Sequence, residues 1–187
     1  MILNKIGIIA VFLIFLFSGL YFGIGGLSRL KLDETVEELD RNKETLLKDT
    51  FNIKLNEITI KNKYDYLYEL EANDLENFFP WAIQFSSFSA LIITALSFGL
   101  LGALIAILKQ IAFENLVIEE VKIWSLPLLG LLTGLVIYGL SYILPTALVK
   151  NGTELRPITL MFLCLLSGIY SNTFYLRLTK LFDKISI

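Results

Sequence analysis

Four long stretches of the chain carry no charged side chain. They contain 23, 32, 27 and 20 residues, and lie between Lys5 and Arg29, Glu76 and Lys109, Lys122 and Lys150, and Arg156 and Arg177. A helix needs roughly 20 apolar residues to cross about 30 Å of hydrocarbon. The stretches lack the alternation of a membrane barrel. The pattern therefore predicts an all-α membrane protein with four transmembrane helices, at about 6–26, 81–108, 125–149 and 158–176.

The polar segment 27–80 separates the first predicted span, within 1–26, from a three-helix module over 81–187. We expect this segment to form a small α+β insertion outside the membrane. Its first part predicts a helix of about four turns up to Asp49, because apolar residues recur at steps of three and four: Leu32, Val36, Leu39, Leu46 and Leu47. Thr35 and Glu38 have the spacing of a capping box for this helix.

Beyond Asp49 the period of the pattern changes to two. The runs ITI, KNK and YDYLYEL, residues 58–70, predict a β-hairpin, with a further short strand at 53–55 as an option. Tyr64, Tyr66 and Tyr68 would then share one strand face. They are either the core of this segment or a recognition surface. Asn73 and Glu76 have capping-box spacing before an aromatic entry to the second span.

The basic residues of the short segments favour an orientation with both termini in the cytoplasm. Six bases of these segments then lie inside, Lys5, Lys109, Lys122, Arg177, Lys180 and Lys184, against Lys150 and Arg156 in the short outer loop. The long outer segment 27–80 carries eight further bases, which count against this orientation, and thirteen acids. The linker 109–124 and the tail 177–187 become cytoplasmic surfaces where a soluble protein could dock. The candidate docking residues are Glu114, Glu119, Glu120, Lys122, Arg177, Lys180 and Lys184. Alternatively, both segments lie on the lipid surface.

The residue inventory argues against an enzyme. The chain has no histidine and one cysteine, Cys164, so an internal disulfide is impossible and metal, haem or iron–sulfur sites of the usual ligands are not expected. No Asp, Glu, Lys or Arg lies within a predicted span, which opposes a proton-coupled pump or transporter. We find no phosphate-binding glycine motif, and expect no cofactor and no direct binding of nucleic acid.

Small residues recur every four positions in each predicted span. These candidate helix-packing residues are Gly19, Gly23, Ala95, Gly99, Ala103, Gly130, Gly134, Ser167 and Ser171. Such stripes let helix backbones approach closely in lipid. The spacing leaves open whether they pack within one subunit or between the subunits of a homo-oligomer, for which a tetramer is our choice. Polar, mostly hydroxyl-bearing residues of the last two spans could instead line a pore: Thr133, Tyr138, Ser141, Tyr142, Thr146, Ser167, Tyr170, Ser171 and Asn172.

The last half of the chain resembles a three-helix module of bacterial membrane proteins. The resemblance lies in GLLGALIAILKQ, LPLLGLLTGLVIYGL and LLSGIYSNTFYLRLTKLFDKI, which give a glycine-rich helix, a charged linker, an LLGxxxGxxxY helix and a final helix ending in basic residues. It implies a bacterial inner membrane. In length and four-span layout, the chain also resembles membrane subunits of the Kiwa anti-phage defence system. That resemblance implies a homo-oligomer that senses envelope disturbance and engages a cytoplasmic DNA-binding partner.

Together these features predict a non-enzymatic membrane sensor or scaffold. It would associate with copies of itself, sense with the outer segment and signal to a cytoplasmic protein. The alternative function is a pore-forming effector or a small ion channel.

Overall fold

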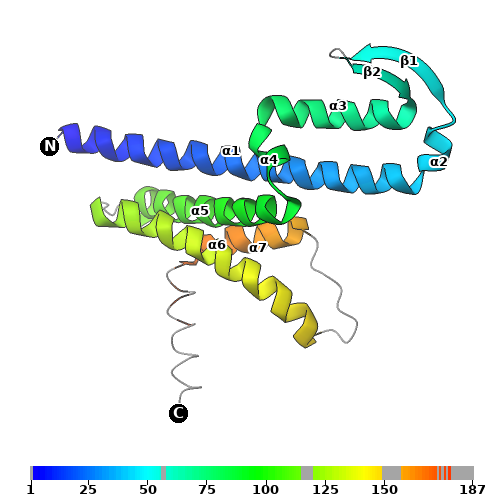
Figure 1. Cartoon of the computed structure of the whole chain (residues 1–187). Helices are drawn as coiled ribbons and strands as arrows, with labels where there is room; N and C mark the ends of the chain where they lie inside the picture. Colours follow the sequence, from blue (N-terminus) through cyan, green and yellow to red (C-terminus); the bar gives the residue numbers. More distant parts are fainter. Residues whose placement is uncertain are drawn as a thin grey trace. The chain divides into compact units, whose positions relative to one another are not determined.

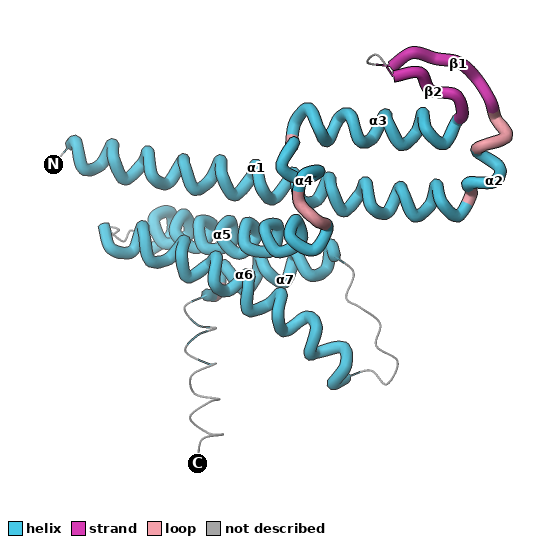
Figure 2. Tube along the Cα trace, viewed as in Figure 1, coloured by secondary structure: helices cyan, strands magenta, loops and turns pink. Residues whose placement is uncertain are grey.

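The computed structural model describes residues 2–55, 58–114, 120–148 and 157–171, together with 173, 175 and 177. Figures 1 and 2 show the elements in chain order. They are α1 (Ile2–Arg41), α2 (Lys43–Leu46), β1 (Thr50–Leu55), β2 (Ile58–Asn62), α3 (Lys63–Phe78), α4 (Pro80–Gln84), α5 (Ser87–Glu114), α6 (Glu120–Leu148) and α7 (Pro157–Ile169). The chain divides into two compact units. We call Gly25–Leu91 the polar unit, and Met1–Ile24 with Ile92–Ile187 the apolar unit.

Helix α1 is continuous over 40 residues, so it joins the first predicted span to most of the predicted extramembrane helix. The predicted end at Asp49 is wrong, because α1 ends at Arg41 and the short helix α2 follows. The prediction of a break after residue 26 and a new cap at Thr35 is wrong. Glycine costs a helix only about 1 kcal/mol relative to alanine. At Gly25 the side-chain position is taken by other groups, because a Cβ there would lie 2.8 Å from Phe79 and 2.9 Å from Trp81. This glycine makes room for aromatic rings and does not end the helix.

The hairpin of the polar unit lies earlier in the chain than expected. Strand β2 contains the predicted ITI strand, and it pairs antiparallel with β1, matching Ile53 with Ile60 and Leu55 with Ile58. The optional strand at 53–55 is therefore real. The strand predicted over YDYLYEL is wrong, since these residues belong to helix α3.

A reciprocal cap at Asn62 explains why α3 is helical. The Asn62 side chain accepts a hydrogen bond from the Asp65 backbone N–H at 2.8 Å. The Asn62 amide also donates to the Asp65 carboxylate at 2.8 Å. The first bond satisfies one of the backbone N–H groups that the first helical turn leaves free, and the second holds the Asn62 side chain in place. It starts a helix where the alternation of tyrosines indicates a strand.

The core of the polar unit lies between α1, α3 and α4. Leu32, Leu75 and Ala82 are buried, and Val36, Phe79, Trp81 and Ile83 pack around them. Trp81 belongs to α4, and α5 begins at Ser87, so the predicted start of the second span at residue 81 is wrong. The predicted cap of Asn73 with Glu76 is also wrong, because both lie inside α3.

Three helices of the described chain are long and apolar enough to cross a membrane, within α1, α5 and α6. Helix α7 is apolar but has 13 residues. In the apolar unit, Leu100, Leu104 and Ile107 of α5 form a buried cluster against Phe12, Phe15 and Leu16 of α1 and Leu126 and Leu131 of α6. The predicted linker 109–124 is helical at both ends, since α5 runs to Glu114 and α6 begins at Glu120.

Candidate functional site

Helices α5 and α6 pack closely in the apolar unit. A Cβ added at Gly99 would overlap the Gly130 carbonyl oxygen and lie 2.8 Å from the Gly134 backbone nitrogen. One added at Gly130 would lie 2.5 Å from the Ala103 Cβ, and one at Gly134 would overlap the Ala95 carbonyl oxygen. The structure thus brings together all five small residues predicted for these two helices, and does so within one chain.

Helix α7 also packs against α5 at glycines. A Cβ at Gly168 would overlap the Gly99 carbonyl oxygen, and one at Gly102 would overlap the Leu165 carbonyl oxygen. Sequence reasoning missed Gly102 and Gly168, although GLLG at 99–102 places two glycines on adjoining helix faces. Of the predicted pair on α7, Ser171 is buried and Ser167 is half-buried.

The glycines of α1 also face α5. A Cβ at Gly19 would lie 3.0 Å from the Leu101 side chain, and one at Gly23 would lie 3.4 Å from the Phe98 ring. The small residues predicted to pack in α1, α5 and α6 therefore have neighbours inside the chain. A homo-oligomer would have to pack through larger apolar side chains that are exposed in the single chain, such as Ile14 and Phe17 of α1, both 66% exposed.

Hydroxyl groups in α5 and α6 bond to their own helices. Thr133 is fully buried and donates to the Leu129 carbonyl at 2.7 Å. Ser97 donates to the Ile93 carbonyl at 2.7 Å, and Ser141 to the Tyr138 carbonyl at 2.6 Å. Back-bonding of this kind satisfies a hydroxyl without water. Among the predicted pore-lining residues, Thr133 therefore lies in a packed interior within this chain.

The polar unit contains a groove between α1, α2 and α3. Its volume is about 520 Å³, within the range of roughly 300–1,000 Å³ that ligand sites occupy. Three leucines contribute apolar surface, Leu39, Leu46 and Leu67. The polar lining residues are Thr35, Glu38, Asn42, Thr45, Lys63 and Glu71. A groove with an apolar base and both signs of charge suits an amphipathic ligand or peptide.

Ion pairs join the elements around this groove. Lys63 of α3 lies 3.9 Å from Asp49, and Lys31 of α1 lies 3.4 Å from Glu71 of α3. These pairs are exposed, so each contributes at most about 1 kcal/mol. They fix which faces of α1 and α3 meet more than they stabilise the fold.

The three predicted recognition tyrosines do not form one patch. Because α3 is a helix, Tyr64 and Tyr68 lie one turn apart on one side, and Tyr66 points to a different side. The prediction of a shared strand face is wrong. Tyr64 donates to the Asp40 carboxylate at 2.9 Å, and Lys43 lies 5.0 Å from the centre of its ring. This hydrogen bond is the largest cause that raises the pKa of the Tyr64 phenol, and desolvation of the phenol is the next largest.

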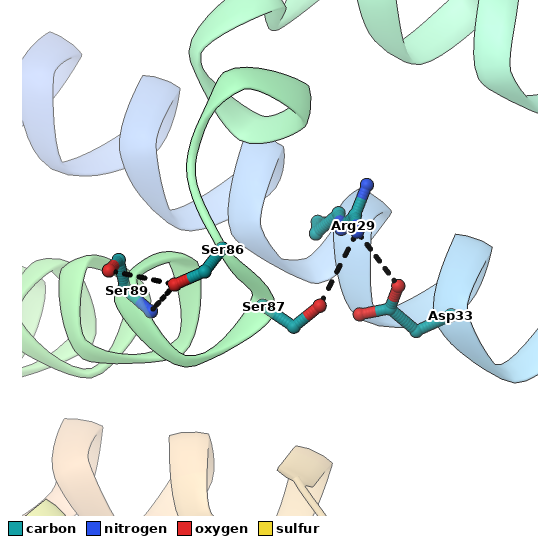
Figure 3. Close-up of polar contacts among 5 residues, drawn as sticks. All are labelled: Arg29, Asp33, Ser86, Ser87 and Ser89. Atoms are coloured by element: carbon teal, nitrogen blue, oxygen red, sulfur yellow. Dashed lines mark hydrogen bonds and ion pairs between the residues drawn. The ribbon is translucent and has the colours of Figure 1, made fainter.

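A second polar cluster lies within the polar unit where α5 begins (Figure 3). Arg29 Nη2 lies 3.2 Å from Asp33 Oδ1 and donates to Ser87 Oγ at 3.4 Å. Ser86 caps α5, since its Oγ accepts from the Ser89 N–H at 3.2 Å. The contact joins residues 58 positions apart, so no local pattern in the sequence could have indicated it.

The structure describes some of the candidate docking residues. Glu114 ends α5, and Glu120 and Lys122 lie in the first turn of α6. Arg177 is exposed and lines a cavity of about 500 Å³ with Leu166, Ser167, Tyr170 and Thr173. Glu119, Lys180 and Lys184 lie outside the described residues.

The long apolar helices define the chain as a membrane protein. In the part of the chain that the structure describes, no group of three His, Cys, Asp or Glu side chains is placed to hold a metal ion. No protein-family model, curated protein or solved structure matches the chain.

Proposed function

We propose that this chain is a non-enzymatic membrane sensor or scaffold subunit, whose polar unit binds a ligand or protein outside the bilayer. The observation that carries the proposal is the continuity of α1. One helix supplies Gly19 and Gly23 to the packing of the apolar unit, and Glu38 and Leu39 to the groove of the polar unit. A ligand in the groove therefore contacts a helix that also enters the membrane.

The cellular setting follows from charge and resemblance. Six bases near the span ends favour both termini in the cytoplasm of a bacterium, with four passes through the inner membrane. Signalling would use the ends of α5 and α6 and the basic residues from Arg177 onward. Resemblance to Kiwa membrane subunits makes anti-phage defence the process to test.

Self-association through glycine stripes is less well supported than association through large apolar residues. The glycines of α1, α5 and α6 with close neighbours already contact other helices of the same chain. The outward face of α1 carries Ile6, Ile9, Ile14 and Phe17, which are exposed in the single chain. In a homo-oligomer these side chains would pack against a second copy, and in a monomer against lipid.

The test is purification in mild detergent with neighbouring genes co-expressed, followed by measurement of the mass of the complex. We expect a homo-oligomer that carries a soluble protein, and loss of that protein when Glu114, Glu120 and Lys122 are reversed in charge. Reversal of Glu37, an exposed residue of α1, is the control. A complex without any soluble partner, together with ion flux from the purified protein in liposomes, would contradict the proposal in favour of a channel.

A further inference from the structure

Arg29 marks the end of the first apolar stretch. It is the first charged residue after Lys5, and its side chain is 21% exposed. Its partner Ser87 is the first residue of α5, which then runs without charge to Lys109. We expect a charged residue at this position to lie at the depth of the lipid headgroups, since the apolar stretch before Arg29 and the one after Ser87 are each long enough to fill the hydrocarbon layer.

The guanidinium of Arg29 has more donors than its partners use. Arginine carries five N–H groups, and both Asp33 and Ser87 contact the same nitrogen, Nη2. Nε is buried and has no hydrogen-bond partner among the described residues. Figure 3 shows a terminal nitrogen of Arg29 pointing away from both partners. The Ser87 hydroxyl accepts from Arg29 and keeps its own hydrogen to donate.

The surroundings of this cluster fit a membrane interface. Phe85 and Phe88 in the same unit are 49% and 59% exposed. Aromatic rings concentrate at the headgroup level, where one side is apolar and the other is wet. At that depth the abundant acceptor of several hydrogen bonds is the phosphate of a phospholipid, and arginine matches its geometry with two parallel N–H groups.

We propose that Arg29 and Ser87 bind the phosphate of an anionic phospholipid. Arg29 donates from the terminal nitrogen that Asp33 and Ser87 leave free, and the Ser87 hydroxyl donates a second hydrogen bond. The Asp33 carboxylate competes with the phosphate electrostatically, because its ion pair with Arg29 neutralises part of the guanidinium charge. This inference concerns a site separate from the groove and stands without the sensor proposal.

The test measures binding of phosphatidylglycerol to the full chain in detergent, by counting retained lipids in the intact complex with mass spectrometry. We expect Arg29→Gln to bind phosphatidylglycerol at least about tenfold more weakly, because a charge-assisted hydrogen bond contributes roughly 1.5–3 kcal/mol and about 1.4 kcal/mol corresponds to tenfold. Arg41→Gln is the matched control, since Arg41 is an exposed arginine at the end of the same helix and donates to the Glu37 carbonyl. It should leave binding unchanged. Equal binding by both variants would overturn the proposal.

Two further variants keep the test decisive if Arg29→Gln does not fold. Ser87→Ala should weaken binding by at least about threefold, because one hydrogen bond to the phosphate is lost. Asp33→Asn should strengthen it, because the competing carboxylate is gone. Weaker binding by Asp33→Asn, or no change in either variant, would contradict the assignment. Inorganic phosphate and phosphatidylcholine serve as comparison probes. If either one matches phosphatidylglycerol, the site is not selective for an anionic headgroup, and the proposal fails.

Discussion

The helices inside the two units of this chain pack in different ways. In the apolar unit, close backbone contacts at Gly99, Gly130, Gly134 and Gly168 add to a cluster of large apolar side chains. In the polar unit the helices pack through the buried leucines Leu32 and Leu75. Lipid offers little hydrophobic drive between helices, so close backbone contact is needed there. Water drives apolar side chains together. Helix α1 packs in both ways, through Gly19 and Gly23 in the apolar unit and through Leu32 in the polar unit.

The largest expected effect comes from adding one methyl group at the glycine crossing. Gly99→Ala places a Cβ against the Gly130 carbonyl oxygen, which is backbone and cannot move aside without shifting α6. We expect a loss of about 3 kcal/mol, at the upper end of overpacking penalties. The thermal midpoint of the purified protein in detergent measures it.

Gly139→Ala is the matched control for that prediction. It is the same substitution in α6, at a glycine with no heavy atom within 4 Å of the added methyl among the described residues. It should leave the midpoint unchanged or raise it slightly, because alanine favours a helix. A similar loss for both variants would mean that the crossing does not hold the helices together.

The leucine core of the polar unit should give the next largest effect. Leu75 is 4% exposed, and Leu75→Ala should cost about 2–3 kcal/mol through lost burial and a cavity. Leu70→Ala is the control, since Leu70 lies on the same helix and is 43% exposed. Hydrogen exchange of α3 would report the difference, and equal protection in both variants would count against this core.

The cap at the start of α3 should have an intermediate effect. Asn62→Ala removes the side chain that bonds both the Asp65 N–H and the Asp65 carboxylate. We expect a loss of about 1 kcal/mol, with fraying confined to the first turn of α3. Asn73→Ala, a substitution inside the same helix, should not produce fraying at residues 63–66. Exchange rates of those amides distinguish the two.

The smallest expected effect depends on pH. Tyr64→Phe removes the hydrogen bond to Asp40, and in this half-exposed setting should cost about 0.5 kcal/mol near neutral pH. The folded pKa of Tyr64 is raised above its ordinary 10.0, chiefly because the neutral phenol donates to Asp40. The contribution is therefore complete below pH 10 and is lost as pH rises through the raised pKa. A midpoint difference between wild type and Tyr64→Phe that stays constant from pH 8 to pH 11 would contradict this.

The sequence indicated the helical membrane architecture and the small residues at helix crossings, because both follow from composition and a spacing of four. It did not indicate that α1 is continuous past Gly25, since two adjacent glycines before a polar stretch are also typical of a helix end. The function of Gly25 depends on its contact with the rings of Phe79 and Trp81, which lie far from it along the chain.

The error at α3 has a different origin. Tyrosines at 64, 66 and 68 alternate as in a strand, but Asn62 and Asp65 already have the spacing of a cap. Local capping outweighed the alternation. The groove of the polar unit and the contact of Arg29 with Ser87 could not be predicted, because they join segments far apart along the chain.

The account rests most directly on the polar unit lying outside the bilayer, on the outer side. We would measure labelling of single cysteines by a membrane-impermeant maleimide in intact cells, using a Cys164→Ser background. Lys61→Cys in β2 should react without permeabilisation, and Leu132→Cys in α6 should not react until detergent is added. Labelling of Lys61→Cys only after permeabilisation, or equal labelling of both positions in intact cells, would contradict the account.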